Sequence, residues 1–306
     1  MTKRFFLIGD VMVDITALVV EPINYASDTP ARVSLQVGGA ATNTACWLAH
    51  DDESATLIGA IGQDPFGELI TAHLERKRVT GSLAAIPGSA TGTCIIIVDE
   101  VGERTMLPDP GANACLMIHH LPIGVFRSGD HLHLSGYTLL NAATRAVGMA
   151  ALSRARSAGM TISLDPASAA PLAQNPSVLD PALALIDVLI ANEAEAAVLT
   201  GTTDPDHALA VLAERVPTVV VKLGPQGSIA RRVRGPNTGT AESASADAVE
   251  VSVIDTTGAG DAFAAGFLPL WAAGRPLSDC LDGASRSAAR AVARVGAGPG
   301  DVAPGE

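Results

Sequence analysis

Aromatic residues and cysteines are scarce in this chain of 306 residues. Phe, Trp and Tyr make up only 3% of it, so a buried core must consist mainly of Ala, Val, Leu and Ile, which belong to the 48% hydrophobic fraction. The four cysteines, Cys46, Cys94, Cys115 and Cys280, include no CxxC pair, which argues against a zinc site or a redox motif. We therefore expect buried, reduced thiols and a cytoplasmic protein.

Positive charge and long hydrophobic runs are also lacking. The chain has 20 Lys and Arg against 32 Asp and Glu, for a formal net charge of −12, and nucleic-acid binding needs a basic face that no Lys/Arg cluster supplies here. No apolar run approaches the roughly 20 residues of a membrane span. The first apolar run meets Asp10 and Asp14 too early for a signal peptide. Neither a nucleic acid nor a membrane is an expected partner.

The second half of the chain alternates short apolar strands with helices. In chain order, the pattern predicts strand 131–134, helix 142–158, strand 161–164, helix 182–185, strand 188–190, helix 193–199 and strand 218–222. Such alternation is typical of right-handed crossovers in a parallel sheet that is covered on both faces. Ligands bind these sheets at the carboxyl ends of the strands. A further strand is predicted at residues 249–254, after a polar loop at 235–248.

The first third of the chain mixes a buried strand with segments that need not join the same sheet. Residues 5–8 form an apolar run, and residues 40–50 have the apolar spacing of a helix. Residues 31–37 and 93–99 are alternating or β-branched, which is typical of half-exposed strands. No linker rich in Pro, Gly or Ser divides the chain, so we expect a single domain spanning residues 1–306.

The most informative segment is residues 255–267, DTTGAGDAFAAGF. A predicted strand runs into a glycine turn and then into an apolar helix, so the N–H groups of Gly258, Ala259 and Gly260, together with the helix dipole, would form an anion site. Asp261 falls in the first helical turn, where a carboxylate cannot help to bind phosphate. It is useful there as a base that accepts a proton from an attacking hydroxyl. The alternative is an ordinary helix N-cap.

This segment resembles the C-terminal signature of the ribokinase, or PfkB-type, carbohydrate kinases. Other landmarks of that family follow in order along nearly the whole chain: Gly9-Asp10, Asp14, Val37-Gly38-Gly39, Asn43, Gly111-Ala112-Asn113, Asn192-Glu193-Ala194-Glu195 and Lys222-Leu223-Gly224 with Gly227. The resemblance implies a three-layer α/β/α fold with a mostly parallel central sheet and a small β-sheet lid, drawn from about residues 11–37 and 90–110. It also implies ATP-dependent transfer of the γ-phosphoryl group to a hydroxyl of a sugar or sugar-like polyol, with Asp261 as general base.

The resemblance assigns substrate and nucleotide roles to two sets of residues. Substrate hydroxyls would be held by Asp14, Gly38, Gly39 and Asn43, since carboxylate and amide groups each form several hydrogen bonds with a polyol. ATP would lie against Asn192, Glu195, Lys222, Gly224, Gly227 and Ser285. As alternatives, Asp14 could merely cap a turn, the paired glycines could merely allow close packing, and Glu195 could be solvated on a surface helix.

Two cations are implied beside ATP. Mg²⁺ keeps most of its waters, so Glu195 would act on it through water rather than by direct coordination. K⁺ or another monovalent cation would lie beside Asp255 and Thr257, with Gly296 and carbonyl groups around Ala291 completing the site. A structural role for Asp255 in tying down the turn is the alternative.

The resemblance does not extend to a particular acceptor. Ribokinases proper carry a lysine where this chain has Ala40, and a glutamate near the position of Ser135-Gly136-Tyr137. Arg104, between two expected lid strands, could reach an anionic substrate or lie in solvent. The alternatives to a sugar kinase are a nucleoside kinase, which the scarce aromatic residues disfavour, and a sugar-binding regulator without turnover, which Asp261 disfavours. The expected protein partner is a second copy, bound through the lid.

Overall fold

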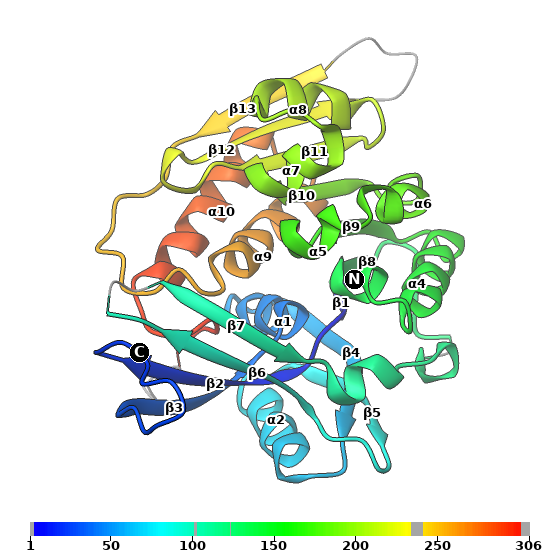
Figure 1. Ribbon diagram of the computed structural model, residues 1–306. Helices are drawn as coiled ribbons and strands as arrows, with labels where there is room; N and C mark the ends of the chain where they lie inside the picture. Colours follow the sequence, from blue (N-terminus) through cyan, green and yellow to red (C-terminus); the bar gives the residue numbers. More distant parts are fainter. Residues whose placement is uncertain (1–2, 101–102, 123, 234–240, 301–306) are drawn as a thin grey trace.

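A large sheet runs through the centre of the protein (Figure 1), for which the computed structural model describes residues 3–100, 103–122, 124–233 and 241–300. Its strands are β1 (Arg4–Ile8), β4 (Ser54–Gly62), β5 (Thr80–Ile86), β8 (His131–Ser135), β9 (Thr161–Asp165), β10 (Val188–Asn192), β11 (Thr218–Lys222), β12 (Ser228–Val233) and β13 (Ala241–Ala246). Within the described residues they lie in the order β13-β12-β11-β10-β9-β8-β1-β4-β5. From β11 to β5 neighbouring strands are parallel, and β12 and β13 form an antiparallel edge. The predicted, mostly parallel central sheet is confirmed.

Helices cover both faces of this sheet, because its strands are apolar on both sides. Along β1, Phe5 and Leu7 belong to one buried cluster, and Phe6 and Ile8 belong to another on the opposite face. The first cluster includes residues of α1 (Ala40–His50), α2 (Pro65–Arg76), α9 (Ala259–Ala272) and α10 (Leu277–Val292). The second includes residues of α3 (Tyr137–Leu140), α4 (Arg145–Ser157), α5 (Ala169–Ala173), α6 (Asp180–Leu183), α7 (Glu193–Thr200) and α8 (Pro205–Ala213). This arrangement confirms the three-layer fold.

A second, smaller sheet lies beside the first (Figure 1). Its strands are β2 (Met12–Val19), β3 (Ala31–Gly38), β6 (Gly92–Val98) and β7 (Arg104–Asp109), in the order β3-β2-β6-β7 across the described residues. β2 and β6 are parallel, whereas the two edge strands are antiparallel to their neighbours. The segments expected to supply a small sheet, 11–37 and 90–110, do so.

The prediction of a strand at residues 249–254 is wrong. This segment has no regular secondary structure, and four of its apolar side chains are exposed, namely Val249, Val251, Val253 and Ile254. The sheet edge next to β12 is already occupied by β13, which lies entirely within the polar loop predicted at 235–248, so that part of the loop prediction is also wrong. Alternating valines indicate a strand only where a partner strand is available. Residues 235–240 of that predicted loop fall outside the described residues.

The cysteines lie mostly in the interior of the protein. All four are free, three of them are buried, and Cys115 is half-buried. In the described part of the chain, no helix has both the length and the apolar character that crossing a membrane would require.

The carboxyl ends of the parallel strands meet at one edge of the large sheet. Ser135 pairs with Asp165 across β8 and β9, and Asn192 pairs with Lys222 across β10 and β11. In the sheet, β1 has β4 as its neighbour on one side and β8 on the other, so the chain adds strands first in one direction and then in the other. The crevice above β1 and β8 is therefore the topological switch point, where sheets of this type bind ligands.

Candidate active site

A glycine turn opens α9 at this edge of the sheet. Gly258 adopts the left-handed conformation, with φ 74°, and an added Cβ would lie 2.4 Å from the carbonyl oxygen of Ala297. The N–H of Ala259 donates to the carbonyl of Thr256 at 3.3 Å, whereas the N–H groups of Gly260 and Asp261 meet no acceptor in the described residues. Free amides at a helix N-terminus attract anions. The N–H of Gly260 is thus available to an anion, as predicted, whereas the N–H of Ala259 already donates to Thr256.

Asp261 lies in the first turn of α9, with its carboxylate directed at α1. Nδ2 of Asn43 donates to Oδ2 of Asp261 at 2.8 Å. Burial raises the pKa of Asp261 to about 7, against the hydrogen bond from Asn43, and the charge of Asp165 adds to the rise. The helix N-cap is Gly258, so the capping alternative for Asp261 is excluded. A carboxylate that titrates near neutral pH is suited to act as a general base.

Lys222 supplies a positive charge beside the glycine turn. Its Nζ lies 3.0 Å from Oδ2 of Asp165, and a Cβ added to Gly260 would lie 3.1 Å from the same Nζ. Burial alone would lower the pKa of Lys222, but the carboxylates of Asp165 and Glu195 outweigh burial and raise it. The ammonium group is therefore charged and positioned where it can contact a bound phosphate.

Asn192 and Glu195 bond to each other at the start of α7. The N–H of Asn192 donates to Oε2 of Glu195 and its Nδ2 donates to Oε1, both at 2.8 Å, and Oδ1 of Asn192 accepts the N–H of Glu195 at 2.8 Å. Glu195 is only 2% exposed, so the solvated alternative is wrong. Burial and the nearby charge of Asp165 raise the pKa of Glu195 to about 7. A carboxylate with both oxygens engaged is not arranged for direct metal binding.

The small sheet brings Asp14 to the same crevice. A Cβ added to Gly38 would lie 2.1 Å from Oδ2 of Asp14, and Gly39, with φ 99°, would place a Cβ 2.2 Å from the carbonyl oxygen of Asp10. Both glycines are thus required for close packing where β3 runs into α1. Burial raises the pKa of Asp14 to about 6, and its charge in turn raises the pKa of Asp261. The carboxylate of Asp14 accepts no hydrogen bond from the described residues.

Comparison with known proteins identifies the family. The family model described as pfkB family carbohydrate kinase matches residues 2–303. The chain belongs to the pfkB family. It is 31% identical over 276 residues to a fructokinase of Klebsiella pneumoniae, covering 88% of this chain and 84% of the relative.

Solved structures agree with this assignment. The adenosine kinase from Sinorhizobium meliloti has a TM-score of 0.85 and 27% identity, covering 98% of this chain and 96% of that one. The fructokinase from Vibrio cholerae O395, in fructose, ADP and calcium ion bound form, has a TM-score of 0.80 and 27% identity, covering 97% and 94%. The ribokinase-like fold and the kinase class predicted from the sequence are confirmed.

The other three residues that were predicted to contact the nucleotide in this pfkB chain are Gly224, Gly227 and Ser285. Gly224 has φ +58° and faces open space, as a backbone that approaches a ligand would. Gly227 has φ +90°, and a Cβ there would lie 2.0 Å from the carbonyl oxygen of Ala246, so packing against β13 already explains this glycine. Ser285 is buried on α10.

Asp255 and Thr257, the two residues predicted to hold a monovalent cation, bond to each other, and Asp255 accepts N–H groups through both carboxylate oxygens. Oδ1 of Asp255 accepts the N–H of Thr257 at 2.7 Å, and Oδ2 accepts the N–H of Gly296 at 2.9 Å. Arg104 forms an ion pair with Asp255 and donates to Oγ1 of Thr256 at 3.3 Å. Arg104 therefore lies neither in solvent nor in the acceptor crevice. These contacts favour a structural role for Asp255, in fixing the glycine turn, over a role in binding a cation.

Three residues at the crevice had no assigned role in the sequence interpretation: Asp165 was not named, Asp10 was named only as a family landmark, and Tyr137 only as a departure from ribokinases. Asp165 follows the strand predicted at 161–164, so the position of a polar residue at a strand end could have found it. Tyr137 begins α3, and burial, together with the charge of Asp10, raises its pKa to about 12. Asp10 and Tyr137 line a small cavity of about 20 Å³.

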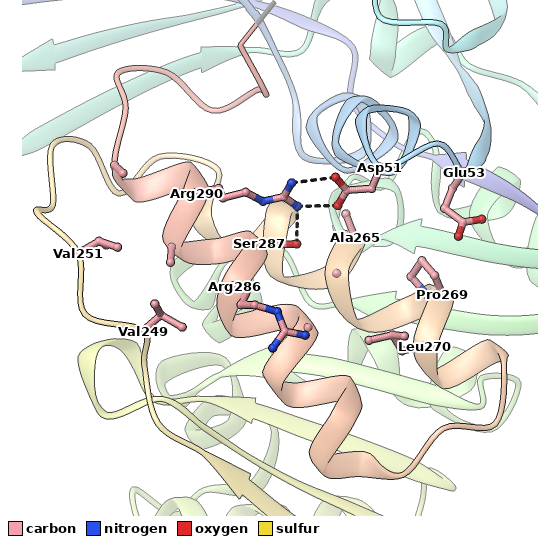
Figure 2. A pocket seen from close by; sticks show the side chains of 14 residues that line it. Asp51, Glu53, Val249, Val251, Ala265, Pro269, Leu270, Arg286, Ser287 and Arg290 are labelled. Atoms are coloured by element: carbon pink, nitrogen blue, oxygen red, sulfur yellow. Dashed lines mark hydrogen bonds and ion pairs between the residues drawn. The ribbon is translucent and has the colours of Figure 1, made fainter. Parts of the chain in front are cut away.

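The largest cavity described for the chain lies elsewhere. A groove of about 740 Å³ runs along α9 and α10 and contains none of the predicted site residues. Figure 2 shows Arg290 of α10 pointing across it to Asp51, which follows α1, with Nη1 2.8 Å from Oδ1. Size alone does not identify the reaction site of this pfkB kinase.

Proposed function

We propose that this kinase transfers the γ-phosphoryl group of ATP to a hydroxyl of an uncharged sugar or sugar-like polyol, with Asp261 as general base. The observation that carries the proposal is the arrangement of Asp261, which combines a pKa of about 7 with a position beside the free N–H of Gly260 and the ammonium of Lys222. A base and an anion site in contact are what in-line transfer to a hydroxyl needs.

The residues divide the chemical work between them. Asp261 takes the proton from the acceptor hydroxyl as it attacks phosphorus, and Asn43 holds the carboxylate in orientation. The amides of Gly260 and Asp261, with Lys222, stabilise the negative charge that is on the transferred group. The γ-phosphoryl group passes to the acceptor, ADP leaves, and the proton remains on Asp261 until water removes it.

The charge of the crevice supports an uncharged acceptor. Asp10 and Asp14 accept no hydrogen bond from the described residues through their carboxylates, and burial raises the pKa of each to about 6. Both nearby cations are paired, Lys222 with Asp165 and Arg104 with Asp255. Sugar hydroxyls can donate to free carboxylates, whereas an anionic acceptor would be repelled by them.

Mg²⁺ is proposed to accompany ATP, and the charges at the nucleotide end of the site fit it. Burial is the main reason that the pKa values of Glu195 and Asp261 are raised, and the charge of Asp165 adds to both; an incoming divalent cation would favour the ionised form of each carboxyl group. Bound to the phosphates, the cation neutralises their charge. Asn192 and Glu195 would reach its water shell. Gly224, Gly227 and Ser285 remain proposed nucleotide contacts.

A nucleoside acceptor is a second candidate, and one observation favours it. Tyr137 places an aromatic ring at the mouth of the crevice, where the residue is 37% exposed. Nucleobases stack on such rings. The likeness to the adenosine kinase from Sinorhizobium meliloti is consistent with this acceptor.

The small sheet is proposed to close over the acceptor within a single domain and to pair with a second copy. One of its faces carries Asp14 toward the crevice. On the other face, Leu35, Ile95 and Leu107 lie in one row across the sheet and are about half exposed, and Val33 is more exposed still. Exposed apolar rows of this kind mark interaction surfaces. Light scattering of the protein in solution tests the dimer.

The reaction is tested by measuring ADP release from ATP over a panel of neutral sugars, sugar phosphates and nucleosides. The proposal expects turnover with one or more neutral polyols and little ATP hydrolysis without an acceptor. Turnover of a nucleoside alone would select the second candidate. Acceptor binding without ADP release, in protein that binds ATP, would instead identify the non-catalytic regulator.

A further inference from the structure

A cation from the small sheet lies beside the glycine turn. Arg104 is the first residue of β7, and its guanidinium pairs with the carboxylate of Asp255 and donates to Oγ1 of Thr256. The side chains of Arg104 and Asp255 are only 24% and 16% exposed. The pair is thus largely withdrawn from water, which strengthens the attraction between the two charges.

The oxygens that a monovalent cation would need here already face N–H donors. K⁺ is held by oxygens that replace its hydration shell. Both carboxylate oxygens of Asp255 accept backbone N–H groups, from Thr257 and from Gly296. The nearby carbonyl of Val292 accepts the N–H groups of Ile254 and Asp255. A cation would have to compete with donors at each of these oxygens.

The charges at this point are balanced without an added ion. The carboxylate of Asp255 faces the guanidinium of Arg104 as well as the N–H groups of Thr257 and Gly296. The charge of Arg104 therefore neutralises that of Asp255. A further cation would meet no net negative charge and would be repelled by the guanidinium.

We propose that Arg104 takes the place of the monovalent cation beside the anion turn, so that the kinase does not require K⁺. The proposal rests on the phosphoryl transfer proposed above. Arg104 acts through Asp255, which fixes the N–H of Thr257 immediately before Gly258, and it is therefore a positioning residue. The positive charge beside Asp255 is thus supplied by a residue of the small sheet.

The opposite edge of the small sheet meets the same group of residues. A Cβ added to Gly296 would lie 2.0 Å from Oε1 of Gln36 on β3, and Gly296 donates to Asp255. Both edge strands, β3 and β7, therefore contact the structure that fixes the glycine turn. Closure of the small sheet would bring the guanidinium to the turn, and opening would remove it.

The test compares K⁺ with choline, a cation too large for such a site, at a constant ionic strength of about 0.1 M so that screening is equal. ADP release with a turned-over acceptor and ATP affinity by calorimetry are both measured. In the unchanged protein, both should differ by less than about twofold between the two salts, which is under 0.5 kcal/mol. Arg104→Ala should lose on the order of tenfold in kcat without K⁺ and recover part of it with K⁺. Arg104→Lys should retain independence from K⁺.

Arg32→Ala is the matched control. Arg32 is exposed and lies in the same row of the small sheet as Arg104, on the opposite edge strand. It should change neither kinetics nor salt response. A tenfold or larger activation of the unchanged protein by K⁺, on the order of 1.4 kcal/mol, would overturn the proposal while leaving the kinase function intact. Equal salt response in Arg104→Ala and the unchanged protein would also overturn it. If no acceptor is turned over, which would count against the proposed function alone, the ATP affinities in the two salts still distinguish these outcomes.

Discussion

Asn43 and Asp261, 218 positions apart in sequence, share a hydrogen bond of 2.8 Å between Nδ2 and Oδ2. The bond joins α1 to the first turn of α9 and leaves Oδ1 of Asp261 available to an acceptor hydroxyl. Because it favours the ionised carboxylate, it opposes the effect of burial on the pKa of Asp261. The amide of Asn43 thus orients the proposed base and limits the rise of its pKa, which burial causes.

Asp261→Asn should lower kcat by on the order of 10²–10⁴-fold, because general-base catalysis contributes about that much. The amide retains the size of the carboxylate but cannot accept the acceptor proton. ATP affinity, measured by calorimetry, should change little. A variant that keeps more than about a tenth of the rate, a barrier change of under 1.4 kcal/mol, would remove Asp261 from the mechanism.

The rate should depend on pH through Asp261. With a pKa of about 7 in the folded protein, the base is protonated on the acid side, so kcat/KM should fall about tenfold for each pH unit below 7. Asn43→Ala removes the hydrogen bond that favours the carboxylate, and it should therefore move this acid limb to higher pH. A profile without an acid limb between about pH 5 and 8 would show that another group limits the reaction.

Gly258→Ala and Gly260→Ala should differ sharply. At Gly258 a Cβ meets the Ala297 carbonyl at 2.4 Å and φ is +74°, whereas at Gly260 a Cβ meets only the flexible end of Lys222, at 3.1 Å. Gly258→Ala should lower the free energy of unfolding by more than about 1 kcal/mol and greatly reduce turnover. Gly260→Ala should remain as stable as the parent in urea titrations and lose mainly ATP affinity. Equal stability losses would contradict this description of the turn.

Asp14→Asn should stabilise the ligand-free protein at neutral pH. The pKa of Asp14 is about 6 in the folded protein against an ordinary value of 3.8, so the folded state binds more protons between these values, and the free energy of unfolding falls as pH rises through this window. The variant should melt a few degrees higher at about pH 8, and the gain should shrink toward about pH 4. It should also lose acceptor affinity.

Asp28→Asn is the control for this prediction, because Asp28 is exposed and lies in the loop between β2 and β3. Its melting temperature should match that of the parent at both pH values. If Asp14→Asn melted lower than the parent at about pH 8, burial of a charged Asp14 would not be costly, and its pKa could not be raised by burial.

The parts of this fold that local sequence determines were predictable. Helix α1 and strand β11 have the predicted bounds, because apolar spacing and β-branched runs specify them locally. Asp165 escaped notice because its role depends on β9 lying two strands from β11, which brings it to Lys222. The strand predicted at 249–254 failed for a related reason, since pairing depends on which neighbour occupies the edge. Arg104 could be placed only once β7 was known to face the turn.

The raised pKa values of Asp10, Asp14 and Asp261 have a consequence for binding equilibria. At neutral pH, Asp261 still binds its proton in about half of the molecules, and Asp10 and Asp14 in a smaller share. A ligand that stabilises these carboxylates, by donating hydrogen bonds or by bringing a cation, must displace the protons into the buffer. Ligand affinity is then partly a deprotonation equilibrium, and the enzyme exchanges protons with its surroundings before any phosphoryl group moves.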